Sequence, residues 1–159
     1  MDLPPAATRV AAVLAERGAA GTPVVLPDAA RTAVAAAAAL RVPVGAIANS
    51  LVFSADGTPV LVLTSGAHRV DTSWLATRLG LPALERAAPE QVRAWTGQVI
   101  GGVSPVAHPQ RLRTIVDRWL AQHEVVWAAA GHPHAVFPTT CVELVRLTGG
   151  ELGDVAPRS

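Results

Sequence analysis

A two-residue repeat around an Asp-Gly pair constrains the fold of this 159-residue chain more than any other feature. From Ile47 to Phe53 the side chains alternate between two faces, and Asn49 falls on the face that carries the larger apolar residues. Asp56-Gly57 is a typical hairpin turn, and the residues from Val60 to Thr64 favour β-structure. The pattern predicts two central antiparallel strands and raises the question of why an amide stands among apolar neighbours.

Helical spacing, capping residues and helix-stopping glycines predict the elements around these strands. We expect a first helix that ends at Gly18 and a second that starts at Pro27-Asp28 and ends at about Leu40. A third should run from a cap at Asp71 or Thr72 to Gly80, and a fourth from Pro89 to Gly97. A fifth should begin with a capping box at Thr140 and end at Gly149. We expect further strands at Thr22 to Leu26, before the loop in VIGGVSPVAHP, at Ile115-Val116, and from Glu124 to Ala130. Helices and strands interleave irregularly, which predicts one mixed α/β (α+β) domain over residues 1–159, with a mobile tail at 155–159, rather than a doubly wound fold.

Composition excludes several classes of protein. Half of the residues are hydrophobic and the formal net charge is only +1, so the chain lacks the broad basic field that binds duplex nucleic acid by charge alone. All thirteen basic residues are arginine, so no chemistry here can use a lysine amine. No apolar run is long enough to span a bilayer and the N-terminus lacks a basic signal region, so we expect a cytoplasmic protein with no membrane partner.

The motifs of common catalytic and metal sites are weak or missing. His132-Pro133-His134 would place two imidazoles on one face of a strand, but a single cysteine and no nearby carboxylate cluster leave too few ligands, so we expect no metal and no cofactor. No G-x-S-x-G elbow is present, and the apolar helical surroundings of Cys141 predict a buried, inert thiol.

A pair of glycines at Gly101-Gly102 is the remaining chemical feature. Glycines let a backbone approach a ligand closely and expose N–H groups as a nest for an anion, and Pro105 fixes the exit of the loop. A β-bulge or a tight turn explains the same spacing without any ligand.

Four stretches taken together, IANSLVF, PVLVLTSGAHRVD, TGQVIGGVSP and AGHPHAVFPTTCVEL, resemble the YbaK family over about Thr22 to Leu147. This family comprises free-standing relatives of the editing domain inserted in bacterial prolyl-tRNA synthetases. The resemblance implies a core at residues 22–147 and a curved, mixed, mostly antiparallel sheet surrounded by helices. It also implies hydrolysis, in trans and without a cofactor, of the ester between a wrong amino acid and a tRNA. The implied partners are the tRNA acceptor end carrying that aminoacyl group and an aminoacyl-tRNA synthetase.

The resemblance also assigns site residues. Gly101 to Pro105 matches the G-x-x-x-P motif, whose backbone amides hold the aminoacyl carbonyl while water attacks with help from the neighbouring ribose hydroxyl. Asn49 stands where the deacylases of the family carry a lysine. The implied catalytic residues are therefore Asn49, Gly101, Gly102, Ser104 and Pro105, with Ser50, His108 and His132 as weaker candidates for contacts to tRNA or adenosine.

Three functions stay open at this point. The first is a deacylase of mischarged tRNA, the second a module that binds tRNA or an aminoacyl-adenosine but lost turnover with the lysine, and the third a hydrolase of another aminoacyl ester or of a D-amino-acid derivative. The G-x-x-x-P loop favours an enzyme, whereas Asn49 favours a binding module.

Overall fold

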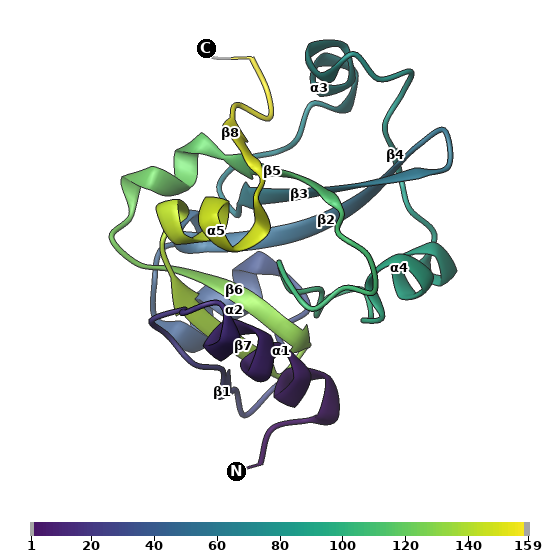
Figure 1. The fold of residues 1–159 in the computed structure, drawn as a ribbon. Helices are drawn as coiled ribbons and strands as arrows, with labels where there is room; N and C mark the ends of the chain where they lie inside the picture. The colour runs from purple at the N-terminus through teal and green to yellow at the C-terminus, as the bar shows by residue number, and fades with distance from the viewer. Residues whose placement is uncertain (1, 158–159) are drawn as a thin grey trace.

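The structure is a computed structural model that describes residues 2–157, and within them five α-helices surround one mixed sheet (Figure 1). The helices are α1 (Pro5–Glu16), α2 (Ala33–Leu40), α3 (Thr72–Leu79), α4 (Pro89–Thr96) and α5 (Cys141–Thr148). The strands are β1 (Val24–Val25), β2 (Ile47–Ala55), β3 (Thr58–Ser65), β4 (Glu85–Arg86), β5 (Arg113–Asp117), β6 (Val126–His132), β7 (Ala135–Thr139) and β8 (Glu151–Gly153). This confirms the predicted single mixed α/β domain.

The strands β2 and β3 lie at the centre of the sheet, as the alternating pattern predicts. The strand order is β1-β7-β6-β2-β3-β5-β8, and β4 adds to β2 beside this path. Of the strand pairs in the described residues, β1–β7, β7–β6, β2–β3 and β2–β4 are antiparallel, and β2–β6, β3–β5 and β5–β8 are parallel. Asp56 and Gly57 form the hairpin turn with φ of 52° and 86°, the left-handed values that a two-residue turn of this kind requires.

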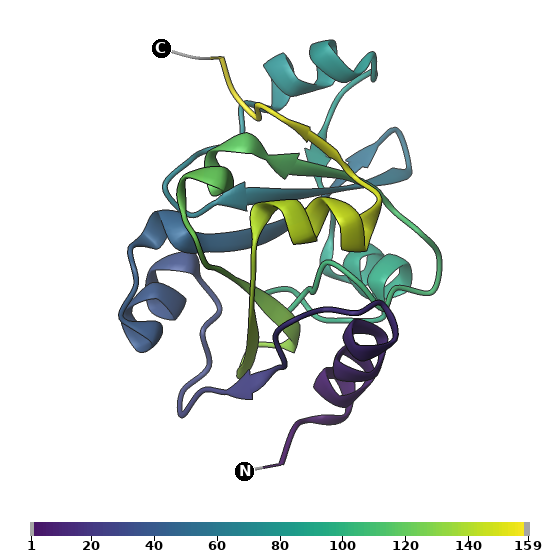
Figure 2. The same ribbon diagram turned by 60° about the vertical axis from the view of Figure 1, so that its left-hand side comes forward.

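Helices cover both faces of the sheet, and alternate residues of β2 pack against different helices. Helices α1, α4 and α5 cover the face that carries Ala48 and Val52, whereas α3 covers Phe53 and α2 covers Ile47. Figure 2 shows the sheet between α2 on one side and α1 and α4 on the other. Asn49 and Ser50 therefore face opposite sides of the sheet.

Helix α2 begins later than the sequence predicts. Thr32 is its N-cap, with its hydroxyl accepting a hydrogen bond from the Ala35 amide at 3.1 Å, so Asp28 lies outside the helix. The preceding residues are held in extended form because the amides of Leu26 and Ala30 donate to the carbonyls of His134 and Pro133. Contacts to a distant turn thus override the local helix-start signal.

The segment before the G-x-x-x-P motif is a loop and not the predicted strand. Gln98 takes the place of a neighbouring strand: its side-chain oxygen accepts from the Ser104 amide at 2.7 Å, and its side-chain nitrogen donates to the Val106 carbonyl at 3.3 Å. A single buried amide side chain therefore holds the loop from within.

The C-terminal region is more ordered than expected as far as residue 155. Strand β8 adds to the edge of the sheet beside β5. Val155 is 1% exposed and its carbonyl accepts from the Asp71 amide at 3.0 Å, so it belongs to the core and not to a mobile tail. The last two residues of the predicted tail lie outside the described residues. No helix between residues 2 and 157 is long and apolar enough to cross a membrane.

Candidate functional site

The candidate site lies where the edge of β2 is left open. On this edge β2 pairs with β6 only through Ile47 and Ala48, and with β4 only through Phe53 and Ser54. The Val52 carbonyl accepts from the Ala87 amide at 3.0 Å, so even-numbered residues direct their backbone groups toward this edge. The N–H and C=O of Ser50 therefore point into a gap in the sheet.

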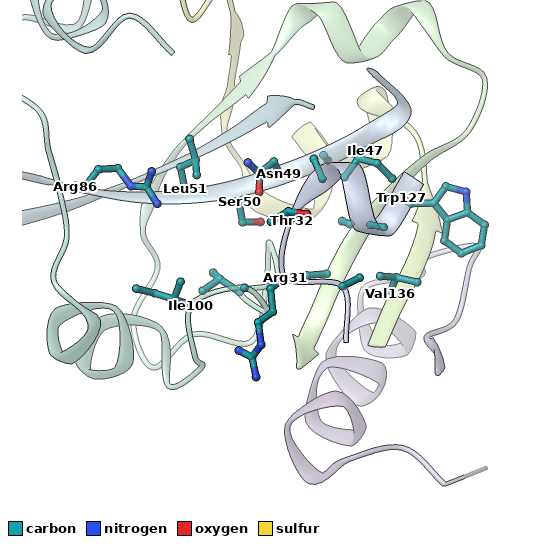
Figure 3. Close-up of a pocket in the computed structure, with 18 residues that line it drawn as sticks. Arg31, Thr32, Ile47, Asn49, Ser50, Leu51, Arg86, Ile100, Trp127 and Val136 are labelled. Carbon is teal, nitrogen blue, oxygen red and sulfur yellow. The ribbon is translucent and has the colours of Figure 1, made fainter. Parts of the chain in front are cut away.

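A cavity of about 230 Å³ fills this gap. Figure 3 shows β2 running along it, with Arg86 at one end and Trp127 at the other. Alanines form a large part of the walls, and the side chains with polar atoms are those of Arg31, Thr32, Asn49, Ser50, Arg86 and Trp127. The lining comprises Ala30, Arg31, Thr32, Ala33, Ala36, Ile47, Ala48, Asn49, Ser50, Leu51, Arg86, Ile100, Gly101, Val103, Trp127, Ala128, Ala129 and Val136. Such a space suits a small, largely apolar group.

Ser50 supplies an unusual polar atom to this cavity. Its hydroxyl is buried and makes no hydrogen bond, and it is the one buried side-chain nitrogen or oxygen of the described residues in that condition. In Figure 3, Ser50 lies on the side of β2 that faces Ile100, whereas Leu51 points away on the other side. A buried hydroxyl without a partner costs about 1–3 kcal/mol, so its place in a cavity marks a position for a polar atom of a ligand.

Asn49 lies next to Ser50 on the opposite face of β2. It pairs in register with Thr64 of β3, is half-buried, and lines the cavity. Within residues 2–157 its side-chain amide has no hydrogen-bond partner, so backbone groups of the protein do not satisfy it. An amide offers both donors and an acceptor, and here all of them are available to a ligand or to water.

The two glycines of the loop serve different purposes. Gly101 has φ of +90°, and a Cβ at this position would lie 3.3 Å from the side chain of Arg31. A Cβ at Gly102 would lie 2.7 Å from the carbonyl carbon of His132, so Gly102 allows the loop to pack on the turn between β6 and β7. The close approach at Gly102 is thus to the protein's own backbone.

Two amides of this loop remain free to bind a ligand. The Gly102 amide donates to the Val99 carbonyl at 3.0 Å, and the Ser104 amide donates to Gln98. The amides of Gly101 and Val103 have no partner in the described part of the chain, and both residues line the cavity. Free amides that border one space are the kind of group that can hold a carbonyl or an oxyanion.

Ser104, Pro105 and His108 do not line this cavity. Ser104 is fully buried, and its hydroxyl donates to the Val106 carbonyl. Pro105 and His108 line a separate hollow of about 350 Å³ behind the loop, which also contains Arg17 and Arg111. The His108 ring donates to the Ser104 carbonyl at 2.8 Å, and burial is the main cause that lowers the pKa of His108 below its usual value.

The remaining histidine and cysteine candidates also lie outside the cavity lining. His132 is the half-buried last residue of β6, with its ring centroid 5.5 Å from that of His134, and burial is the main cause that lowers its pKa. No group of three histidine, cysteine, aspartate or glutamate side chains placed to hold a metal occurs within residues 2–157. Cys141 is buried, and burial raises the pKa of its thiol.

A histidine–aspartate pair on the Asn49 face of the sheet has no signal in the local sequence. The Nδ1 atom of His68 donates to Asp117 at 3.0 Å, and Asp117 is 1% exposed. The same carboxylate oxygen accepts from the Ser65 amide at 2.9 Å and from the Thr64 hydroxyl at 3.2 Å. The pair spans 49 residues of sequence, so only the pairing of β3 with β5 brings its members together.

Comparison with known proteins places this arrangement among editing domains. The model of the "Aminoacyl-tRNA editing domain" family matches residues 27–147. A solved structure proposed to be a trans-editing enzyme for prolyl tRNA synthetase has 41% sequence identity and a TM-score of 0.90, and the match covers 99% of this chain and 100% of that one.

Curated relatives match over shorter stretches. The proline–tRNA ligase of Nitratidesulfovibrio vulgaris strain Hildenborough is 43% identical over 67 residues, which cover 42% of this chain and 12% of the ligase. The proline–tRNA ligase of Leuconostoc citreum is 36% identical over 92 residues, which cover 58% of this chain and 16% of the ligase. The chain thus spans only a small part of the length of these ligases.

Proposed function

Because the chain belongs to the aminoacyl-tRNA editing domain family, we propose that it hydrolyses, in trans, the ester that joins a small wrong amino acid to a tRNA. One observation carries the proposal: a small cavity combines two free loop amides with an open strand edge. The tRNA acceptor end is the partner of this reaction, a synthetase of the proline type is the source of the mischarged tRNA, and the cytoplasm is where both would meet it.

The chemistry in this proposal needs no nucleophilic side chain. Water attacks the ester carbonyl carbon with help from the ribose hydroxyl beside the ester, the bond to the ribose oxygen breaks, and the amino acid leaves as a carboxylic acid. The amides of Gly101 and Val103 would donate to the carbonyl oxygen as it gains negative charge. A single donor of this kind contributes about 3–4 kcal/mol to the transition state in enzymes where one was removed.

Asn49 and the cavity walls have separate roles in this proposal. The unpartnered amide of Asn49 orients the attacking water or a ribose hydroxyl, in place of the lysine of related deacylases. The alanines of the walls, with Trp127 and Val136, would contact the acyl side chain and so decide which amino acid the cavity of about 230 Å³ accepts.

A panel of charged tRNAs tests the proposal. Single-turnover deacylation is measured for tRNAs carrying alanine, serine, threonine or cysteine on the proline and cognate acceptors, with prolyl-tRNA as the matched control. We expect one small aminoacyl ester to be hydrolysed well above its rate in buffer and prolyl-tRNA to be spared. Buffer rates for every ester would contradict the proposal.

The lack of charge at Asn49 favours a second function, a module that binds an aminoacyl-tRNA without turnover. Asn49→Lys separates the two functions because it restores the residue of related deacylases. If the wild type binds but does not hydrolyse while Asn49→Lys hydrolyses the same ester, the chain is a binding module. If the wild type already hydrolyses the ester, the module is excluded.

A further inference from the structure

A second hollow lies against the face of β2 that carries Asn49. Its volume is about 320 Å³, and we call it the outer hollow. It shares Asn49, Leu51 and Arg86 with the cavity in the sheet gap, so the two spaces meet along β2. A molecule with one end in the cavity would reach the outer hollow by passing around the edge of β2 that β6 and β4 leave unpaired, beside Asn49.

Two exposed arginines, Arg69 and Arg86, line the outer hollow together with His68. Neither arginine takes part in an ion pair with another residue of the described chain, whereas Arg113, Arg118 and Arg146 do. The Arg86 guanidinium lies 5.9 Å from the centre of the Phe53 ring, which fixes its position on the wall. Two free guanidinium groups in one hollow suit a phosphate, which arginine binds through paired hydrogen bonds.

His68 is held in one orientation beside these arginines. Its Nδ1 donates to the buried carboxylate of Asp117, and its ring lies 4.4 Å from the Trp119 ring. Its other nitrogen, Nε2, makes no hydrogen bond with any residue in the described range. This atom accepts a hydrogen bond from a hydroxyl when the ring is neutral and donates one to a phosphate oxygen when the ring is protonated.

We propose that the outer hollow binds the sugar and 5′-phosphate of the nucleotide that carries the acyl group, with Arg69 and Arg86 on the phosphate and His68 on the sugar. The assignment rests on the proposed function, because the acyl group in the cavity defines which end of the substrate reaches the hollow. It also accounts for Asn49, which lies where the spaces meet and brings no charge of its own. The charge that binds the phosphate then comes from Arg86 of β4 and from Arg69 in the loop between β3 and α3.

Binding of adenosine 5′-monophosphate and of adenosine to the full chain tests this proposal without any hydrolysis. Titrations followed by NMR or calorimetry compare the wild type, the double variant Arg69→Gln/Arg86→Gln, His68→Gln and the control Arg9→Gln. Arg9 is an exposed arginine of α1, so its substitution matches the charge change of one arginine outside the hollow.

The expected pattern assigns each side chain to one part of the nucleotide. The wild type and Arg9→Gln should bind the monophosphate at least tenfold more tightly than adenosine. The double arginine variant should lose this preference and keep its affinity for adenosine, and His68→Gln should weaken both ligands. An unchanged preference in the double variant, loss of the preference in the control Arg9→Gln, or no binding of the monophosphate by the wild type would overturn the proposal.

Hydrolysis measured on the same variants separates this proposal from the proposed function. If no ester is hydrolysed but the arginine-dependent preference remains, the deacylase fails and the nucleotide site stands. If an ester is hydrolysed with the same KM by the wild type and by the double arginine variant, the deacylase stands and the nucleotide site fails.

Discussion

The front and back halves of the segment from Gly101 to His108 differ in whether their polar groups have hydrogen-bond partners within the protein. In the front half, the amides of Gly101 and Val103 are free and border the cavity. In the back half, the Ser104 amide is bonded to Gln98 and the Ser104 carbonyl accepts from the His108 ring. Free polar groups are costly inside a protein, so their restriction to the front half indicates where a ligand belongs.

The two serines of the site region show the same contrast. Ser50, beside the front half, has a buried hydroxyl without a partner. Ser104, in the back half, donates to the Val106 carbonyl and accepts from the Val106 amide at 3.2 Å. Both hydroxyls are buried, and only their partners distinguish a structural group from one available to substrate.

The largest expected effect comes from disturbing the support of the front half. Gly102→Ala places a Cβ within 2.8 Å of backbone atoms of His132 and Pro133, so the loop must move. Displacing the two free amides should lower the single-turnover deacylation rate by roughly a hundredfold. Gly80→Ala is the control for a loss of stability alone: Gly80 ends α3 with φ of +69°, so an alanine there is strained, but nothing lies near its Cβ position and the loop is not displaced. Equal rates for Gly102→Ala and the wild type would remove the loop from the reaction.

Exchanging each serine for alanine should change stability in opposite directions. Ser50→Ala removes an unsatisfied buried hydroxyl and should raise the free energy of unfolding by about 1 kcal/mol. Ser104→Ala removes the acceptor of the Val106 amide, although the Val106 carbonyl keeps its bond from Gln98, and should lower the free energy of unfolding by about 1–3 kcal/mol. Urea unfolding of both variants measures the difference. Destabilisation by Ser50→Ala would mean that its hydroxyl has a structural role.

A smaller effect on the deacylation rate is expected from Asn49 of β2, whose amide borders the same cavity as the free amides of the front half. Its amide has no partner within residues 2–157, so Asn49→Ala should leave the unfolding midpoint unchanged. Loss of one hydrogen bond to water or ribose should lower the single-turnover rate about tenfold. A large loss of stability, with an unchanged rate, would instead give the amide a structural role.

The smallest expected effect is a change in how stability depends on pH, and it comes from His108 in the back half. The pKa of His108 is lowered mainly by burial, so the unfolded chain binds a proton more readily than the folded one. Its contribution to stability is therefore complete above the usual histidine pKa of 6.5 and declines as the pH falls through 6.5 toward the lower pKa of the folded state. His108→Gln should reduce the fall in melting temperature between pH 7.5 and about pH 5. The same pH dependence in variant and wild type would exclude His108 as its source.

Local signals accounted for much of the fold. The Asp56-Gly57 turn and the caps at Asp71 and Gly80 depend on residues a few positions apart, so the sequence predicts them. Helix α2 was placed too early because contacts of residues 26–30 with the β6–β7 turn are invisible in local sequence. The same limit explains the missing strand before the G-x-x-x-P motif, where Gln98 replaces strand pairing.

The site was less predictable than the fold. The resemblance to the YbaK family implies that Asn49 and the Gly101 loop belong to one site, and both border one cavity. It could not divide the loop into free and bonded halves, because the division depends on the burial of Gln98 and on the approach of His132 to Gly102. The pair of His68 and Asp117 joins strands that meet only in the folded sheet.

The gap in the sheet also bears on how this protein avoids aggregation. An open strand edge normally recruits a strand from another chain, and long open edges lead to aggregation. Here β6 and β4 close the two ends of the gap. An extended peptide could pair only with the short stretch of β2 between Ala48 and Phe53 before it met one of these strands. The opening is therefore wide enough for a small acyl group but too short for a polypeptide strand. Backbone groups of β2 can remain unpaired there without recruiting a strand from another chain.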